Sequence, residues 1–258
     1  MIRADYMLKI FEFRGMIEMK RKMAFGLNRD VIKYIAMFTM FLNHFANVLL
    51  PVNSMAAEIM MNIGYFTAPV MCYFLVEGYQ YTHSKQKYGQ RLLLFAFLSE
   101  IPFVWATGFF ALNMLFTLFF CFLLLCIQEK ETNPIKRMTG TILLFLATLF
   151  SDWALLAPMF TLLFWKYRAD RKGVCRTFVL VGGVFGLMNL LNYLALYPFA
   201  EALLHSLFSV VGVAAAGIVI TCFYNGKRAE RGRVFSKWFF YLFYPLHLLV
   251  LCAVRAIL

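Results

Sequence analysis

The sequence predicts an all-α integral membrane protein, a polytopic helix bundle with about nine membrane segments. Of its 258 residues, 62% are hydrophobic, 18% are aromatic and only 15% are charged, whereas about a quarter of the residues in soluble domains are charged. Apolar stretches recur along the chain, most of them long enough for a helix to cross a hydrocarbon core of about 30 Å. We place these segments at roughly 31–50, 59–79, 92–109, 111–128, 138–150, 153–165, 175–197, 203–224 and 237–256.

The stretch 138–165 determines the topology of everything that follows it. It could form one long helix or two short helices that fold back at Ser151–Trp153. With the N-terminus in the cytoplasm, the hairpin puts all but Arg255 of the 25 lysines and arginines in cytoplasmic segments, as the positive-inside rule requires. We therefore expect a short or re-entrant hairpin at 138–165, in a multi-pass protein of the cytoplasmic membrane with its C-terminus outside.

The net charge of +12 has the same origin, because cytoplasmic loops of membrane proteins face anionic lipid, so we expect contact with lipid and none with nucleic acid. We divide the chain into a basic segment, 1–30, which could lie on the membrane surface, and one membrane domain, 31–256. No cleavable signal peptide is expected. The cysteines form no C-x-x-C pair, so we expect small buried hydrophobes and no metal site; they are Cys72, Cys121, Cys126, Cys175, Cys222 and Cys252.

This topology assigns a depth to each polar residue of the apolar segments. Three times, a basic residue at a cytoplasmic helix end is followed nine to eleven residues later by an ionisable one: Lys33 and His44, Arg91 and Glu100, Lys237 and His247. At 1.5 Å per residue, the second member of each pair lies about 14–16 Å deeper. Ionisable residues at such depth usually face the bundle interior and mark a functional pathway. We expect His44, Glu100 and His247 to converge.

Four further polar residues complete the predicted site. Asn113 and Thr117 enter from the outer face on the fourth segment, and Asp152 occupies the tip of the hairpin near that face. Glu77 lies toward the cytoplasmic end of the second segment.

The spacing from Lys33 to His44 suits an acyl donor carried on coenzyme A. The anionic phosphates of the donor need cations at the cytoplasmic mouth, and its long pantetheine arm would present the thioester about 15 Å deeper. A neutral His44 there could take a proton from an incoming hydroxyl or amine, and Asn113 could donate to the developing oxyanion. Lipid headgroups would hold cations at the same helix ends, which is the competing explanation for them.

Five motifs, in order, resemble the TraX family of membrane proteins, whose founding member N-acetylates the conjugative F pilin. "KYIAMFTMFLNH" also resembles the basic-x10-His motif of the wider membrane acyltransferases. Next come "FTAPVMCYFLVEGYQYTHSKQKYGQRLLLFAFLSEIPF" with Glu77, Arg91 and Glu100, "LNMLFTL" with Asn113 and Thr117, and "SDW" with Asp152. The last is "KWFFYLFYPLHLLVL", with Lys237, Tyr244 and His247. The resemblance spans about 28–252 and implies a membrane acetyltransferase that uses acetyl-CoA.

The chain departs from the family pattern in two places. The family usually has Asp before the first histidine, where this chain has Asn43, and "SDW" lacks the Tyr-Gly that usually follows the Asp. An asparagine can orient the His44 ring but adds no charge to raise its basicity. Either the base is weaker here, or Glu100 orients it, or the chemistry differs.

We therefore predict a membrane acyltransferase that moves acetyl from cytoplasmic acetyl-CoA to an amine or hydroxyl of a peptide or glycan at the outer face. The predicted catalytic residues are Asn43, His44, Glu100, Asp152 and His247. Lys33, Arg91 and Lys237 would bind the donor, and Glu77, Asn113, Thr117 and Tyr244 the acceptor. The first alternative is a small-solute or proton-coupled transporter or channel, in which the same polar column forms the pathway. The second is a scaffold without activity, which Asn43 favours.

Overall fold

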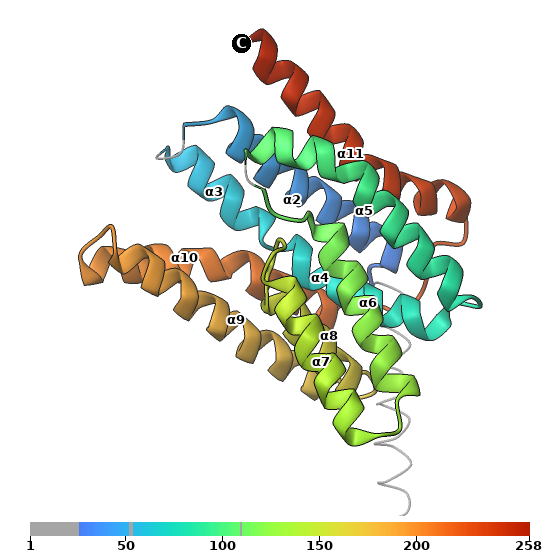
Figure 1. Cartoon of the computed structure of the whole chain (residues 1–258). Coiled ribbons are helices and arrows are strands. Elements are labelled where there is room, and N and C mark those ends of the chain that lie inside the picture. Colours follow the sequence, from blue (N-terminus) through green and yellow to red (C-terminus); the bar gives the residue numbers. More distant parts are fainter. Residues whose placement is uncertain (1–25, 52–53, 109) are drawn as a thin grey trace, which may run out of the picture.

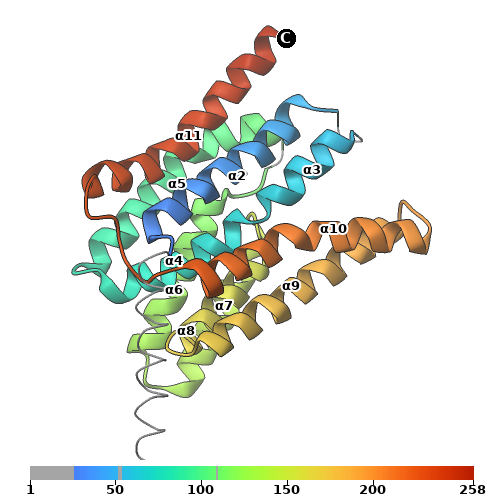
Figure 2. The ribbon, with the colours of Figure 1, turned by 180° about the vertical axis from the view of Figure 1, so that it is seen from behind.

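The computed structural model describes residues 26–51, 54–108 and 110–258, and regular secondary structure in this part of the chain is helical (Figures 1 and 2). The helices are α2 (Arg29–Leu49), α3 (Met55–Gly64), α4 (Thr67–Tyr81), α5 (Lys85–Thr107), α6 (Met114–Lys130), α7 (Pro134–Thr148), α8 (Leu156–Lys166), α9 (Arg171–Leu194), α10 (Phe199–Ile218), the π-helix η1 (Val219–Phe223) and α11 (Arg233–Ile257).

Each predicted membrane segment corresponds to one helix or to two consecutive helices. Four helical stretches of the described chain are long and apolar enough to cross a membrane: Met55–Tyr81, Arg171–Leu194, Phe199–Phe223 and Arg233–Ile257. The predicted all-α membrane bundle is confirmed. The identity of the membrane and the side that each terminus faces stay predictions, and the predicted interfacial role of residues 1–25 lies outside the described residues.

Polar residues just before the helices explain where several of them begin. A side-chain oxygen of the preceding residue accepts a hydrogen bond from a backbone N–H of the first turn, which would otherwise lack a partner. The residues that do so are Asn28, Ser54, Ser84, Asn113, Asn133 and Asp170. Gly108 ends α5 in the left-handed conformation, with φ of 74°, which glycine adopts without a steric cost.

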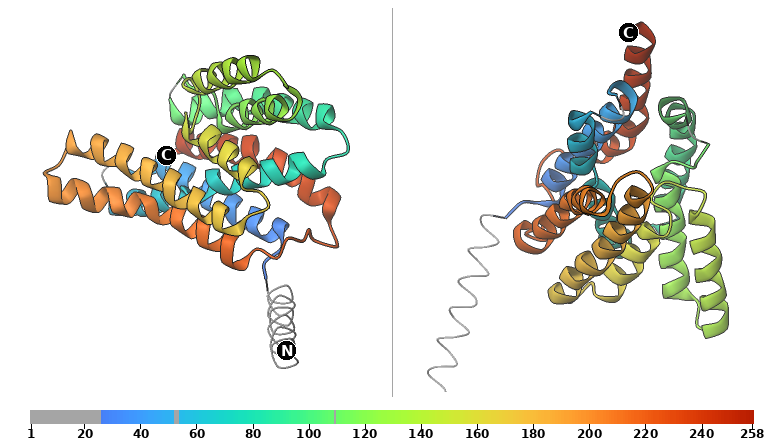
Figure 3. Two further views of the ribbon diagram at one scale, coloured as in Figure 1. Left: turned by 90° about the horizontal axis from the view of Figure 1, so that it is seen from below. Right: turned by 90° about the vertical axis from the view of Figure 1, so that its left-hand side faces the viewer.

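Helix α4 is the centre of the bundle. It packs against α2, α6, α8 and α10, and most of its residues are buried. Figure 3 shows the α9–α10 pair on one side of α4 and the α5–α6–α7 group on the other. A helix that is apolar on all sides is expected to be buried in this way. Helices α2, α5, α6 and α11 surround the remaining face of α4 and form the walls of the site described below.

The predicted single segment 59–79 is broken into α3 and α4 at Tyr65–Phe66. Two glycines allow neighbouring helices to approach this break closely. A Cβ atom on Gly64 would lie 2.3 Å from the Asn43 Cβ, and one on Gly212 of α10 would lie 2.2 Å from the Asn62 carbonyl oxygen. The apolar pattern of the segment gave no sign of the break, because the break depends on packing against α2 and α10.

The predicted hairpin at 138–165 is confirmed, with α7 and α8 as its arms. The Asp152 backbone N–H donates to the Leu112 carbonyl at 2.8 Å, and the Thr117 hydroxyl donates to the Asp152 carbonyl at 2.6 Å. Trp153 and Leu155 have positive φ angles of 58° and 60°, which are strained for side chains of this size. Helix α7 packs on α6, whereas α8 packs on α4, α6 and α9, so the two arms diverge.

Residues 26–30 belong structurally to the membrane bundle, although we assigned them to the N-terminal segment. Helix α2 begins at Arg29. The Leu27 backbone N–H donates to the Phe223 carbonyl, and the Arg29 N–H donates to the Lys227 carbonyl, both at 2.8 Å. These bonds fasten the start of α2 to the loop between η1 and α11.

We predict that Gly212→Ala destabilises the protein, because the new methyl group would meet backbone atoms of Asn62 and Phe66 that cannot move aside by a rotamer change. Overpacking of this kind costs about 1–3 kcal/mol. The matched control is Gly183→Ala on α9, where a Cβ would meet nothing within 4 Å and alanine favours the helix by about 0.8–1 kcal/mol. Thermal unfolding in detergent should show a lower Tm for the first variant only; equal Tm values would contradict the packing described here.

Candidate functional site

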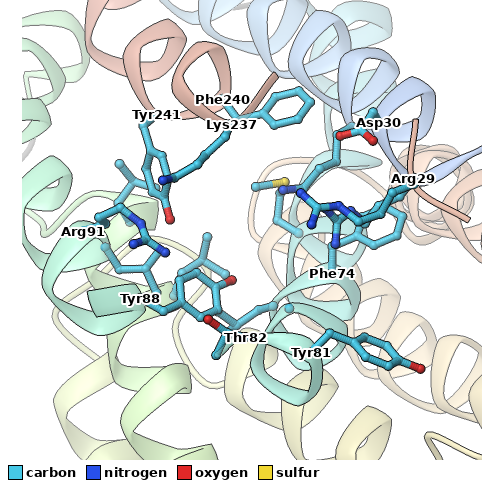
Figure 4. Close-up of a pocket in the computed structure, with 18 of the residues that line it drawn as sticks. Arg29, Asp30, Phe74, Tyr81, Thr82, Tyr88, Arg91, Lys237, Phe240 and Tyr241 are labelled. Carbon is cyan, nitrogen blue, oxygen red and sulfur yellow. The ribbon is translucent and has the colours of Figure 1, made fainter. Parts of the chain in front are cut away.

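The first part of the site is a cavity of about 310 Å³ between α2, α4, α5, α6, α11 and the loop before α11, which we call the cationic cavity. Its lining includes five lysines and arginines: Arg29, Lys33, Arg91, Arg228 and Lys237. Figure 4 shows Arg91, Lys237 and Tyr241 on one side of the cavity and Arg29 with Asp30 on the other. All three predicted donor-binding residues, Lys33, Arg91 and Lys237, therefore line one cavity.

Two carboxylates offset only part of the positive charge of the cationic cavity: Asp30 in its wall, and Glu77, which interacts electrostatically with Arg29, Lys33 and Arg228. The Asp30 carboxylate already accepts the Ala229 backbone N–H at 2.8 Å. The two salt bridges among the described residues, Lys85–Glu129 and His205–Glu58, lie elsewhere. Buried Nε atoms of Arg29 and Arg91 lack a hydrogen-bond partner, and burial together with the Arg29 guanidinium lowers the pKa of Arg228. Groups of this kind fit a polyvalent anion such as a nucleotide phosphate.

The second part of the site is a cavity of about 240 Å³, which we call the histidine cavity. It is lined by Met40, Asn43, His44, Asn47, Met61, Gly64, Tyr65, Thr67, Ala68, Met114, Asp152, Trp153 and Tyr244. Four of the predicted site residues meet here: Asn43, His44, Asp152 and Tyr244. Trp153 stacks on Phe185, with ring centroids 5.3 Å apart and an interplanar angle of 16°.

Two hydrogen bonds determine which nitrogen of His44 is free to act as a base. The His247 Nδ1 lies 2.7 Å from the Phe243 carbonyl oxygen, which can only accept, so this nitrogen carries a hydrogen. In a neutral ring the His247 Nε2 is then an acceptor, and it lies 2.8 Å from the His44 Nδ1. The His44 Nδ1 must therefore donate, which leaves its Nε2 with a free lone pair.

Both cavities are lined by α2, α4, α6 and α11, and their linings come within one turn of each other on α4, α6 and α11; on α2, the nearest lining residues are Lys33 and Met40, about 10 Å apart along the helix. On each of the other three helices, a residue of the cationic cavity lies within one turn of a residue of the histidine cavity. The pairs are Met71 and Ala68 on α4, Leu115 and Met114 on α6, and Tyr241 and Tyr244 on α11. One turn is about 5 Å. Methionines Met40, Met71 and Met114 line the cavities next to this boundary, and their unbranched side chains can rearrange easily.

Neither of the residues that we expected to orient His44 bonds to it. The Asn43 amide donates to the Met61 carbonyl at 3.1 Å, next to the break between α3 and α4. A Glu100 oxygen accepts from the Asn113 amide at 2.7 Å and not from an imidazole. His247 takes the orienting position. Of the three residues that we expected to converge, only the two histidines contact each other directly.

Three other predicted residues occupy supporting positions. The Asn113 Nδ2 donates to the Ala96 carbonyl and to Glu100, both at 2.7 Å, so both amide hydrogens are used and the expected oxyanion role is not available to them. Thr117 holds the turn that carries Asp152. Glu77 accepts from the Tyr224 hydroxyl at 2.5 Å and lies ten residues along α4 from Thr67, about 15 Å from the histidine cavity.

The prediction missed several lining residues, for understandable reasons. Arg29 and Arg228 are spaced like any basic residues near a cytoplasmic helix end, so no pattern distinguishes them from charges that face lipid. Tyr65 and Trp153 enter the histidine cavity because of the helix break and the strained turn.

The described cysteines and acids show no metal-binding arrangement. Within the described ranges, no group of three or more His, Cys, Asp or Glu side chains could hold a metal ion. Cys72, Cys121 and Cys252 are buried, as we expected, but Cys175 and Cys222 are exposed. The expectation of burial was wrong for these two, because they lie on faces of α9 and η1 that no other described helix covers.

The fold and the two cavities define a class: a helical membrane protein with a cavity rich in basic residues next to a cavity lined by a buried histidine. The family profile described as TraX protein matches residues 28–255, and the chain belongs to the TraX family. The probable fimbrial assembly protein FimC, serogroup H1, of Dichelobacter nodosus is 30% identical over 243 residues, which cover 88% of this chain and 95% of that protein. No solved structure matches.

We predict that the histidine pair has a defined tautomer at neutral pH, with both His44 and His247 protonated at Nδ1 and bare at Nε2. The measurement is ¹⁵N solid-state NMR of the histidine-labelled protein in bilayers. Replacing His83 and His205 by glutamine leaves only the signals of the pair among the four histidines. An Nε2–H signal from His247 would contradict the assignment.

Proposed function

We propose that this protein is a membrane-embedded acyltransferase that moves an acetyl group from cytoplasmic acetyl-CoA to an amine or hydroxyl at the opposite face of the membrane. The observation that carries the proposal is the adjacency of a cavity with excess positive charge to a cavity lined by His44, whose Nε2 has a free lone pair. Family membership also supports it, because the motifs resembling the TraX family include residues of both cavities, among them Lys33, Arg91 and His44.

The donor would bind with its phosphates in the cationic cavity. Arg29, Lys33 and Arg91 are half-buried there, whereas Arg228 and Lys237 lie more exposed at its rim. Partner-free guanidinium nitrogens of Arg29 and Arg91 would find acceptors in phosphate oxygens. The pantetheine arm would then extend between the methionines at the boundary of the two cavities and bring the thioester to His44.

His44 would act as the general base. Its Nε2 takes the proton of the nucleophile as the nucleophile attacks the thioester carbonyl, and it returns this proton to the sulfur when the carbon–sulfur bond breaks. His247 is a positioning residue: its Nε2 accepts from the His44 Nδ1 and stabilises the imidazolium that forms. The Phe243 carbonyl maintains the tautomer of His247.

The acceptor would be a surface peptide or glycan. One relative is named a probable fimbrial assembly protein, which supports a subunit of a surface fibre as the acceptor. Asn47 lines the histidine cavity and is exposed, so an acceptor would reach His44 from this end of α2.

The alternative of a transporter has one observation in its favour. Two neighbouring cavities, both lined by α2, α4, α6 and α11, could also serve as the two access sites of a solute pathway. Flux of small solutes into liposomes that contain the protein, without any transfer of acetyl groups, would favour this alternative.

We predict that Arg29→Gln and Arg91→Gln each weaken acetyl-CoA binding about 10- to 100-fold, since a hydrogen bond to a charged group contributes about 1.5–3 kcal/mol. The thermal stabilisation by acetyl-CoA, which grows as RT ln(1 + [L]/Kd), gives the affinity of each variant.

The control for these variants is Arg137→Gln. Arg137 belongs to the basic segment 130–137, which the topology puts on the same side of the membrane, but it does not line the cationic cavity. If all three variants bind acetyl-CoA as the wild type does, the cations serve only lipid headgroups.

We predict that His44→Ala lowers acetyl transfer about 10²- to 10⁴-fold, the usual contribution of a general base, while acetyl-CoA binding is retained because His44 lies outside the cationic cavity. Mass spectrometry of surface peptides and glycans should show an acetyl group that disappears on gene deletion and returns with the wild type but not with His44→Ala. Full acetylation by this variant would refute the base assignment.

A further inference from the structure

The Tyr244 hydroxyl is an unsatisfied polar group at the centre of the site. Tyr244 is only 3% exposed, and its hydroxyl oxygen is buried without a hydrogen-bond partner. Among the buried partner-free atoms of the described chain, it is the one that belongs to a residue of the histidine cavity. A buried hydroxyl without a partner is costly, so its persistence in this position points to a ligand that supplies the missing partner.

The surroundings of this hydroxyl combine the two histidines, a helix N-terminus and two carboxyl groups. The Tyr244 ring lies edge-on to both histidines, with centroids 5.9 Å from His44 and 5.7 Å from His247. The backbone N–H of Met114, in the first turn of α6, is directed at the hydroxyl oxygen, which leaves the hydroxyl hydrogen without an acceptor, while Asp152 and Glu100 act on the hydroxyl with the opposite charge. The N-terminus of a helix carries partial positive charge, so an O–H donor and a helix terminus act on the same region of the cavity.

We infer that Tyr244 is the oxyanion donor of the acyl-transfer step. This inference rests on the proposed function and replaces the earlier expectation for Asn113, whose amide hydrogens are both used by Ala96 and Glu100. It assigns Tyr244 a catalytic contact with the acyl group of the donor instead of a contact with the acceptor.

The acyl-transfer step has the same course for an amine acceptor and for a hydroxyl acceptor. The nucleophile forms a bond to the thioester carbon, the π electrons of the carbonyl move to its oxygen, and His44 Nε2 receives the proton of the nucleophile. Tyr244 donates a hydrogen bond to that oxygen but keeps its own proton. The carbonyl then re-forms, the carbon–sulfur bond breaks, and the sulfur leaves with the proton from His44 as the thiol of coenzyme A.

The test is Tyr244→Phe, which removes only the hydroxyl. Purified full-length protein is mixed with radiolabelled acetyl-CoA and with permeabilised envelopes of the deletion strain, which contain the acceptor. Loss of one oxyanion donor lowers kcat about 10²- to 10³-fold, whereas KM for acetyl-CoA should change less than twofold because the phosphates bind in the other cavity. The Tm should be equal to or above that of the wild type, since the variant removes an unsatisfied group.

The matched control is Tyr34→Phe. This tyrosine lies on α2, lines neither cavity, and its hydroxyl bonds to the Ser236 hydroxyl of α11 at 3.0 Å. Its variant should keep kcat within twofold of the wild type.

The outcomes separate this inference from the proposed function. If the wild type transfers acetyl, His44→Ala does not, and Tyr244→Phe retains full kcat, the Tyr244 inference is wrong and the acyltransferase stands. If the wild type transfers no acetyl group to the envelopes, both fail. A rise in KM with unchanged kcat would also overturn the inference, because it would make Tyr244 a ground-state binding residue.

Discussion

This structure depends on one physical constraint: the hydrocarbon core of a membrane contains no water that could bond to polar groups. Every polar group within a membrane bundle must find a partner inside the protein, because an unpaired group there is costly. Most polar side chains of the described helices meet this demand in pairs that also define the packing. Asn113 with Glu100 links α6 to α5, and the Thr39 and Thr67 hydroxyls link α2 to α4 at 2.9 Å.

Seven buried side-chain atoms of the described residues lack a hydrogen-bond partner, and three of them lie where chemistry is proposed. Partner-free nitrogens of Arg29 and Arg91 lie in the cationic cavity, and the partner-free hydroxyl of Tyr244 lies in the histidine cavity. The other four, on Asn62, Glu77, Ser99 and Thr161, belong to residues that line neither cavity. For the three atoms in the cavities, bound substrates would supply the missing partners.

The two glycines at the break between α3 and α4 connect packing to this site. Gly64 lets Asn43 approach the break, and Gly212 lets α10 support it from the other side. The break directs Tyr65 into the histidine cavity, where its ring packs against Trp153 of the hairpin turn, with centroids 6.1 Å apart. Segments that are distant in sequence thus shape one wall of the cavity.

The sequence by itself determined the helical membrane architecture, the hairpin at 138–165 and the meeting of His44 with His247, because apolar length, charge asymmetry and residue depth are properties of single segments. It also contained the motifs of the TraX family. Only the tertiary structure decided the partners. In the tertiary structure, His247 bonds to His44, whereas Asn43 and Glu100 do not. Asn113 caps the start of α6 and does not line the histidine cavity. Arg29 and Arg228 line the cationic cavity. The physical reason is that hydrogen bonds and cavity walls depend on how each helix is rotated about its axis and on how closely the helices approach one another. The depth of a residue along its own segment determines neither the rotation nor the approach.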